Sequence, residues 1–402
     1  MEHRLGREFS ERIKSFKKWE LIILLAIVVL LFGGIVAYAE ADRIQLQRIC
    51  HEVKDSIAKE KDTPVLGAPE GVVPLFQDTL SGCKVAEIDG VHPAGSARRV
   101  GCDYFVSDGA VSQEELADTG YQLVSRKGDY HFYASEIKAG EWRITQYGTV
   151  SGLQSMCYSL VSADGSFLLV DGGHEVDQEG LRRLIEVFGN RVDLWICSHF
   201  HEDHIGAITA MLPELGEIEI GEIWYPPMDI ETYKTFAKDW DCVDTCEKFL
   251  EEAAGLENAR QVEIGECPVY EGLSFEFLTA YTKDAPWAQE GNNCGFMFQV
   301  NGMHEKMLFC CDIGGEWISE VLINSYGDRL KSDYVQMGHH GNGGLTEEAY
   351  RIVAPQAAFF DSPAWLFADE EKYTTAKNRR LMESLGCTVY VLDEAPNSVI
   401  LK

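Results

Sequence analysis

The sequence predicts an α/β protein with one long apolar segment near its N-terminus. From Trp142 to the C-terminus, apolar runs typical of buried strands alternate with amphipathic runs typical of helices. Residues 63–140 contain shorter strand-like runs separated by turns that include glycine. Residues 21–39 carry no charged side chain. With 402 residues, 46% of them hydrophobic, the chain is long enough for one large domain or two to three smaller ones.

The N-terminal segments predict a single membrane anchor. Residues 1–20 are basic, and Leu21–Ala39 nearly matches a hydrocarbon core of about 30 Å at a rise of about 1.5 Å per residue. Because basic residues precede this run and Glu40 and Asp42 follow it, we expect the N-terminus in the cytoplasm and the bulk of the chain outside the cell membrane. The alternative is a cleaved signal peptide, since Ala37-Tyr38-Ala39 resembles a cleavage site. The length of the run favours an uncleaved, single-pass anchor.

Two further segments precede the main domain. Apolar residues at helical spacing predict a stalk helix over residues 40–62. Residues 63–140 begin with a linker rich in proline and glycine and continue as a small, mostly β region. Its predicted strands are Lys84–Ile88, Asp103–Val106, Tyr121–Ser125 and Tyr130–Ala134. No motif in this region indicates a function.

The main domain is predicted over residues 142–402. Its expected strands are Arg143–Tyr147, Cys157–Ser162, Phe167–Val170, Val192–Cys197, Glu217–Tyr225, Leu273–Ala280, Gly295–Val300, Met307–Cys311, Asp333–Met337 and Ala357–Phe360. Its expected helices are Asp177–Phe188, one that opens at Ile205–Leu212, and Ile230–Ala254. Strands therefore alternate with helices, as in other α/β proteins.

One short stretch stands out chemically, the run from Ser198 to Ala207. It lies between a predicted strand and a predicted helix, where side chains can converge. In an extended turn His199 and His201 point the same way, and Asp203 and His204 lie together at the helix start. Imidazole and carboxylate groups suit zinc or a similar transition metal. The alternative is a histidine-rich surface loop, which the strict spacing disfavours.

Composition limits the partners. The formal net charge is −30, from 65 acidic and 35 basic residues. Such a chain repels nucleic acid and anionic lipid unless a metal or a local basic patch intervenes. Among the twelve cysteines, Cys157, Cys197, Cys310 and Cys311 lie in apolar runs and are expected to be small core residues. Disulfides are possible among Cys50, Cys83 and Cys102, but the sequence does not show which of them pair. Nothing identifies a protein partner.

The pattern His199-x-His201-x-Asp203-His204 resembles the signature of the metallo-β-lactamase fold superfamily. The resemblance extends from about Trp142 to the C-terminus and implies an αβ/βα sandwich with a binuclear metal site along one edge. It also implies that Asp171, in the turn Asp171-Gly172-Gly173, supports the metal loop without binding metal.

Two later positions complete the ligand set implied by this resemblance. Asp312 follows a predicted strand, where the family places a carboxylate that bridges both metals. The alternative role for Asp312 is the N-cap of a helix that begins near Gly315. In Gly338-His339-His340-Gly341 we expect His340 to bind metal, and His339 to support it or face the substrate. The expected ligands are His199, His201, Asp203, His204, Asp312 and His340, with Asp203, Asp312 and His340 expected to be catalytic. The cofactor is two divalent ions, with Zn²⁺ preferred and Mn²⁺ as the alternative.

One stretch departs from the common pattern of the family. Glu290–Phe296 has no histidine where many members carry a further ligand, so Asn293, water or substrate is expected to fill the gap. The Asn-Asn pair, Cys-Asp and His-His-Gly resemble a narrower group, the ComEC-type hydrolase domains and the phosphorylcholine esterases of teichoic acids. Both of these act on phosphodiesters, which implies nucleic acid or cell-wall phosphorylcholine as the substrate.

The sequence therefore predicts a membrane-anchored, extracytoplasmic, metal-dependent hydrolase that cleaves a phosphodiester with hydroxide made available by two metals. The alternatives are a lactam or lactone hydrolase of the same fold and a metal-binding envelope module without turnover. Trp365, close to three acidic residues, is expected to bind substrate. Its ring could hold a quaternary ammonium group or stack on a nucleobase, and the alternative is that it packs its own loop.

Overall fold

The computed structural model describes residues 72–77, 84–88, 90–127, 130–282, 290–392 and 396–402. The chain forms two compact units. The first holds the described residues up to Gln113 together with Tyr121–Ser135, and the second holds Glu114–Gly120 and Glu136–Lys402. The predicted basic segment 1–20, membrane span 21–39 and stalk helix 40–62 lie outside the described residues. None of the helices within the described ranges is both long enough and apolar enough to span a bilayer.

The first unit is a five-stranded sheet with the strand order β1-β2-β3-β5-β4. Its strands are β1 (Val72–Gln77), β2 (Lys84–Ile88), β3 (Tyr104–Asp108), β4 (Tyr121–Lys127) and β5 (Tyr130–Ser135). Only β2 and β3 pair in parallel, and helix α4 (Pro93–Arg99) connects them. The prediction of a mostly β region omitted this helix. Seven residues are too few to show helical periodicity, although Pro93 in the first turn favours a helix start.

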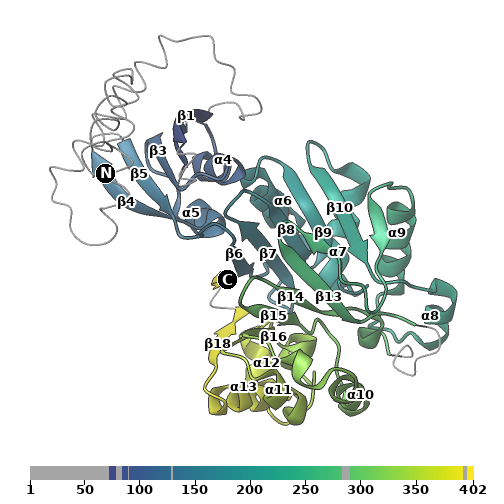
Figure 1. Ribbon diagram of the computed structural model, residues 1–402. Helices are drawn as coiled ribbons and strands as arrows, with labels where there is room; N and C mark the ends of the chain where they lie inside the picture. The colour runs from purple at the N-terminus through teal and green to yellow at the C-terminus, as the bar shows by residue number, and fades with distance from the viewer. Residues whose placement is uncertain (1–71, 78–83, 89, 128–129, 283–289, 393–395) are drawn as a thin grey trace, which may run out of the picture. The chain divides into compact units, whose positions relative to one another are not determined.

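The second unit contains two seven-stranded sheets (Figure 1). The first has the order β11-β10-β9-β8-β7-β6-β19, and the second has the order β12 to β18 in sequence. The first sheet consists of β6 (Trp142–Gln146), β7 (Cys157–Ser162), β8 (Phe167–Asp171), β9 (Arg191–Ile196), β10 (Glu219–Tyr225), β11 (Ala259–Gln261) and β19 (Asn397–Leu401). The second consists of β12 (Val269–Tyr270), β13 (Leu273–Thr279), β14 (Met297–Asn301), β15 (Lys306–Phe309), β16 (Tyr334–Gln336), β17 (Ala357–Phe360) and β18 (Thr388–Val391).

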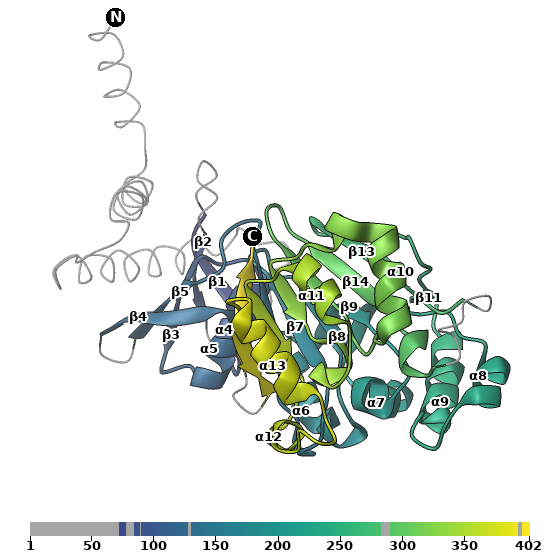
Figure 2. The ribbon, with the colours of Figure 1, turned by 90° about the horizontal axis from the view of Figure 1, so that it is seen from below.

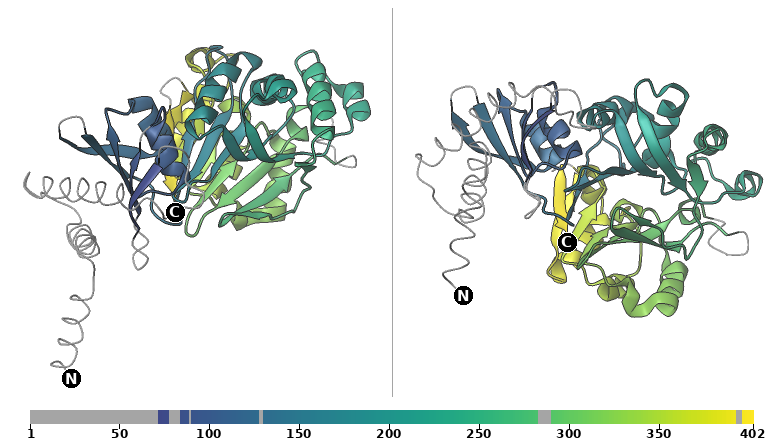
Figure 3. Two further views of the ribbon diagram at one scale, coloured as in Figure 1. Left: turned by 90° about the horizontal axis from the view of Figure 1, so that it is seen from above. Right: turned by 45° about the horizontal axis from the view of Figure 1, so that its top comes forward.

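Helices cover the outer faces of both sheets, which gives four layers. The inner core between the sheets is formed by residues of both, including Tyr158, Phe298 and Phe309. A second buried cluster joins the first sheet to α6 (Gln178–Val187), α7 (Glu202–Met211) and α9 (Val243–Ala254). A third joins the second sheet to α10 (Glu316–Tyr326), α11 (Glu347–Val353) and α13 (Thr375–Ser384). Figures 2 and 3 show the helices lying outside the two sheets, as in an αβ/βα sandwich.

Three further short helices occur among the described residues: α5 (Gln113–Thr119), most of which lies in the second unit, and α8 (Ile230–Phe236) and α12 (Ala364–Ala368) of the same unit. The prediction of one helix over Ile230–Ala254 was wrong, because residues 237–242 separate α8 from α9. Ala237 leaves the helical conformation, and Cys242 adopts a left-handed one with φ of 48°. The apolar spacing continues across this break, so periodicity alone could not reveal it.

The strand directions bring distant segments to one edge of the sandwich. β8 and β9 are parallel, as are β15, β16 and β17. The carboxyl ends of parallel strands lie at the same edge of a sheet, where α/β proteins commonly place their ligands. Asp171 ends β8, and the loop after β9 leads into α7. Asp312 and His340 follow β15 and β16.

Candidate metal centre

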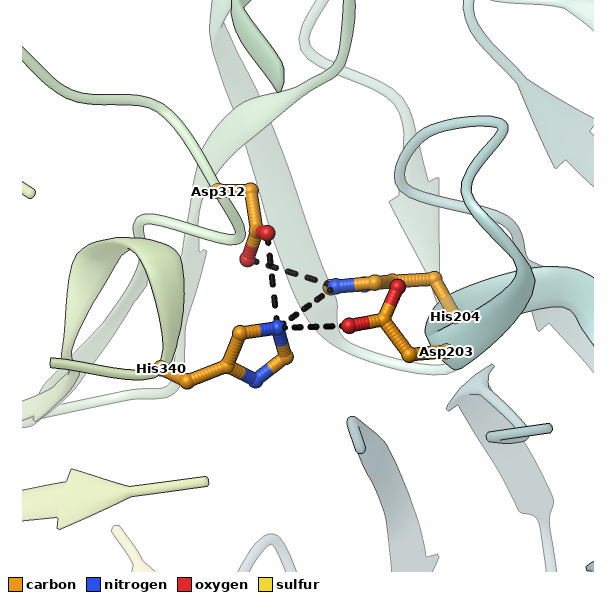
Figure 4. A group of neighbouring side chains, drawn as sticks. All are labelled: Asp203, His204, Asp312 and His340. Carbon is orange, nitrogen blue, oxygen red and sulfur yellow. Dashed lines mark hydrogen bonds and ion pairs between the residues drawn. The ribbon is translucent and has the colours of Figure 1, made fainter. Parts of the chain in front are cut away.

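Four side chains converge at the sheet edge, two from the start of α7 and two from loops after β15 and β16 (Figure 4). The Nε2 atom of His340 lies 3.0 Å from Asp203 Oδ2 and 3.4 Å from Asp312 Oδ2. The Nε2 atom of His204 lies 3.2 Å from Asp312 Oδ1 and 3.3 Å from His340 Nε2. All four side chains are buried or nearly so, and their donor atoms lie within 4.8 Å of one another.

A second group of donors borders the first. His199, His201 and Asp312 also offer one donor atom each within 4.8 Å of one another. His199 Nε2 lies 3.8 Å from Asp312 Oδ2. Asp312 therefore belongs to both groups, which is the arrangement that a carboxylate shared by two cations requires.

Several buried atoms at this centre have no hydrogen-bond partner among the described residues. They are His199 Nε2, His201 Nε2, Asp312 Oδ1 and His340 Nδ1. A buried polar atom without a partner costs about 1–3 kcal/mol, and a cation would supply one to His199 Nε2 and Asp312 Oδ1, which face the other donors. Imidazole nitrogens and carboxylate oxygens are suitable donors for Zn²⁺ or Mn²⁺. The residues present therefore fit two divalent metals.

The electrostatics agree with this fit. Burial, together with the neighbouring His204, holds the pKa of His199 well below its usual range, so its imidazole is neutral and can bind a metal. Burial would raise the pKa of Asp312, but His340 and His204 beside it hold that pKa well below its usual range. Burial likewise opposes protonation of His340, but Asp312 and Asp203 raise its pKa to about 10. Without metal, protons on the histidines balance the carboxylates, and metal binding must displace these protons.

Asp171 holds the first loop in place without joining either donor group. Its Oδ2 accepts hydrogen bonds from His204 Nδ1 at 2.7 Å and from Ser198 Oγ at 2.6 Å. Its Oδ1 accepts the backbone N–H of Ser198 at 2.6 Å. The bond to Nδ1 leaves His204 Nε2 as the nitrogen that faces the other donors. The geometry therefore gives Asp171 the supporting position expected from the sequence.

A left-handed turn places the two adjacent histidines differently. His339 and His340 have φ of 50° and 55°, and Gly341 has φ of 88°. A Cβ at Gly341 would collide with the ring of Phe360, and Ser362 Oγ donates to the carbonyl of His340. This turn brings His340 into the first donor group, whereas His339 is in neither group.

Two predicted substrate-binding residues make contacts with the protein itself. Asn293 Nδ2 donates to the carbonyl of Gly314 at 3.1 Å, and its Oδ1 accepts the N–H of Gly314 at 3.0 Å. This pair fixes the loop after Asp312, which favours a positioning role for Asn293. Trp365 is 40% exposed, and its Nε1 donates to the carbonyl of Gly152 at 3.1 Å. Part of the Trp365 side chain thus remains open for a further contact.

Sequence reasoning missed Asp241, which lies in the break between α8 and α9. Its Oδ1 is 3.3 Å from His201 Nε2, and its side chain is buried. In the sequence, Asp241 lies inside the single helix predicted over Ile230–Ala254. The break places Asp241 outside both helices, because Ala237 leaves the helical conformation and Cys242 has a positive φ, and no residue type in this stretch signals either change.

The comparisons support the family suggested by the motif. Residues 150–223 match the family model described as Metallo-beta-lactamase superfamily. This segment spans β7 to most of β10 and includes Asp171 and the metal loop. No curated protein matches the sequence. The match and the His/Asp cluster together support a metallo-β-lactamase fold that binds divalent metal.

The solved structures found by comparison share little sequence with this chain. The metallo-β-lactamase fold protein YhfI from Bacillus subtilis is 14% identical, with a TM-score of 0.40 over 65% of this chain and 99% of that one. Zn²⁺-bound PqqB from Methylobacterium extorquens is 12% identical, with a TM-score of 0.38 over 65% of this chain and 99% of that one. A diphosphatase of the PhnP family is 11% identical, with a TM-score of 0.36 over 65% of this chain and 97% of that one.

Proposed function

We propose that this protein is a membrane-anchored, extracytoplasmic hydrolase that cleaves a phosphodiester with two divalent metals. The observation that carries the proposal is the sharing of Asp312 between two groups of buried donors. His199 and His201 would hold one ion, and Asp203, His204 and His340 would hold the other. When bound, two such ions lower the pKa of water towards neutrality and offset negative charge on phosphoryl oxygens.

The protein's own nucleophilic side chains near the centre are unsuited to attack. Ser198 is fully buried, and its hydroxyl donates to Asp171. Burial raises the pKa values of Cys197 and Cys311 well above the usual range, so both remain thiols at neutral pH. These three groups therefore do not compete with an oxygen from solvent as the nucleophile, which supports hydrolysis.

The donor set favours a phosphodiester over a lactam or lactone. A phosphodiester carries charge on two non-bridging oxygens, and a pair of ions held by one carboxylate can meet both. The stretch Glu290–Phe296 supplies no imidazole, and this absence distinguishes the chain from many family members. The narrower resemblance to ComEC-type domains and phosphorylcholine esterases supports the same bond type. It leaves nucleic acid and cell-wall phosphorylcholine as the two candidate substrates.

The proposed location rests on residues 1–42 of the sequence alone. A basic segment, an uncharged span and acidic residues follow one another in the order of a single-pass anchor whose C-terminal side is outside. Protease added to intact cells should remove the catalytic unit, whereas full protection until lysis would contradict the orientation.

A hydrolysis screen of the purified protein tests the proposed activity. The substrates are bis-p-nitrophenyl phosphate, single-stranded DNA, a choline phosphodiester, a cephalosporin and a lactone, each with Zn²⁺ or Mn²⁺. We expect turnover of at least one phosphodiester, its loss with a chelator, and its loss in His340→Ala. Asp193→Asn is the matched control, because Asp193 is a buried carboxylate near the opposite end of β9 that accepts the N–H of Phe167. Hydrolysis of only the cephalosporin or the lactone would contradict the proposal.

A further inference from the structure

We propose that Asp241 is a positioning residue of the metal centre that acts through His201. The inference rests on the proposed function, since it concerns the same two-metal site. Asp241 Oδ1 lies 3.3 Å from His201 Nε2, and the two side chains are 3% and 8% exposed. Within the described residues His201 Nε2 has no aligned hydrogen bond, so this carboxylate is the acceptor within its reach.

The break between α8 and α9 holds Asp241 rigidly. Its Oδ2 accepts the backbone N–H of Lys238 at 2.7 Å, and its own N–H donates to the carbonyl of Lys238 at 2.9 Å. The hydroxyl of Tyr233, which is buried in α8, donates to the carbonyl of Asp241 at 2.7 Å. A carboxylate fixed at its backbone and at one oxygen presents the other oxygen in one direction. That direction is towards His201.

The stretch without histidine makes room for this contact. A Cβ at Gly291 would lie 2.6 Å from Asp241 Oδ1 and 3.0 Å from His201 Nε2. Any side chain at this position would therefore have to displace Asp241 or His201. Lys238 Nζ and Glu290 Oε2, 2.9 Å apart, link the break to the same stretch. Gly291 and the break between the helices thus both border the contact between Asp241 and His201.

The geometry favours positioning over direct binding. One of the two groups of mutually close donors includes His201, but neither includes Asp241. A carboxylate on the Nε2 side retains a proton there and leaves Nδ1 as the nitrogen available to a metal. Asp171 does the reverse for His204, because it takes Nδ1 and leaves Nε2. Two carboxylates outside the donor groups would then select the tautomers of two metal-binding histidines.

Cobalt titration of the metal-free protein tests this role. The variant is Asp241→Asn, which keeps the shape but removes the charge, and Asp193→Asn is the matched control. We expect wild type and the control to bind two Co²⁺ per chain with the same dissociation constants. Asp241→Asn should also bind two at saturation, with unchanged visible absorption bands, but with one dissociation constant raised about 10–100-fold. Asp241→Ser, a smaller replacement, should show the same shift if the first variant fails to fold.

The outcomes separate this inference from the proposed function. Unchanged dissociation constants in both variants would show that Asp241 has no part in the centre. Saturation at one Co²⁺ with shifted absorption bands would show that Asp241 is itself a ligand and overturn the positioning role. Saturation of wild type at one Co²⁺ per chain would refute the two-metal centre, and this measurement needs no substitution. Failure of wild type to hydrolyse phosphodiesters while binding two Co²⁺ would refute the proposed substrate alone.

Discussion

Asp312 is the residue on which both donor groups depend. Its two oxygens approach His199, His204 and His340, so its replacement affects both proposed metal positions. We predict that Asp312→Ala binds fewer than one metal per chain and loses at least about 100-fold in activity. Loss of a residue that only supports a ligand costs about 10–100-fold, so a ligand should cost at least the upper end of that range. Elemental analysis and hydrolysis of bis-p-nitrophenyl phosphate measure the two effects. Retention of two metals would show that Asp312 does not bridge the groups.

Trp365 tests the proposed contact with substrate. Its replacement by alanine removes one hydrogen bond to Gly152 and an edge contact with Tyr373 at 5.5 Å between ring centroids. If the exposed ring binds substrate, Trp365→Ala should raise KM for the natural substrate by about 5- to 100-fold, as loss of about 1–3 kcal/mol of stacking would give. Turnover of the small chromogenic diester should be nearly unchanged.

A conservative variant serves as the control for this prediction. Trp365→Phe keeps an aromatic face but cannot donate to Gly152. A KM close to that of wild type in this variant would show that the face, and not the hydrogen bond, matters. If Trp365→Ala instead lowers turnover of both substrates together with the melting temperature, Trp365 packs its loop and the substrate argument fails.

At the scale of elements, Asp361 joins the two sheets beside the metal centre. Its carboxylate accepts hydrogen bonds from Gln146 of β6 at 2.6 Å, Tyr158 of β7 at 2.7 Å and Gln336 of β16 at 2.9 Å. The carboxylate is fully buried, so its removal takes the acceptor from the Tyr158 hydroxyl. Gln146 Nε2 still donates to Tyr158 Oη, and Gln336 Nε2 still donates to the carbonyl of Met337. We predict that Asp361→Ala lowers the free energy of unfolding by about 1–3 kcal/mol, the cost of a buried donor left without an acceptor.

Urea unfolding of the metal-free protein measures this effect without the contribution of bound ions. Asp328→Ala is the control, because the Asp328 side chain is 87% exposed and its ion pair with Lys331 is worth at most about 1 kcal/mol. Equal unfolding midpoints for Asp361→Ala and the control would show that the network does not hold the sheets together.

The sequence predicted the long elements of the second unit because they are buried on both faces or along one stripe. Strands such as Cys157–Ser162 are buried at every position, which an apolar run signals directly. The short helices α4 and α5 were not predicted, since one or two turns show no period. The break after Phe236 was missed because it depends on tertiary contacts of Tyr233 and Asp241.

The candidate site was predictable where ligands follow strands in a fixed order. The three histidines and the aspartate of the metal loop, then Asp312 and His340, converge in the structure as the motif order implied. Asp241 was not predictable, because its approach to His201 depends on the break between two helices. The choice between His339 and His340 depended on the glycine that follows, whose positive φ completes the turn.

For the molecule as a whole, buried carboxyls make stability depend on pH. Burial, with repulsion from Glu114, raises the pKa of Asp118 in α5 to about 7, compared with about 3.9 in an unfolded chain. The fold therefore binds this proton more tightly than the unfolded chain does. The stability that Asp118 contributes is complete below about pH 4 and is lost as the pH rises through about 7.

Asp118→Asn tests this linkage. The amide cannot ionise, so the free energy of unfolding of the variant should rise relative to that of wild type as the pH rises. We predict that the difference in unfolding free energy, variant minus wild type, is on the order of 1–3 kcal/mol larger at pH 8 than at pH 5. Urea unfolding of the metal-free proteins at both pH values measures it. A difference that does not change with pH would show that Asp118 is ionised in the fold throughout this range.

The central claim is that Asp312 and five further side chains hold two divalent ions at the edge of the sandwich. Elemental analysis of the purified protein, after reconstitution with Zn²⁺ or Mn²⁺ and removal of the excess, tests it most directly. The geometry predicts a metal content near two ions per chain. A content near zero would contradict the claim, whatever the activity of the preparation.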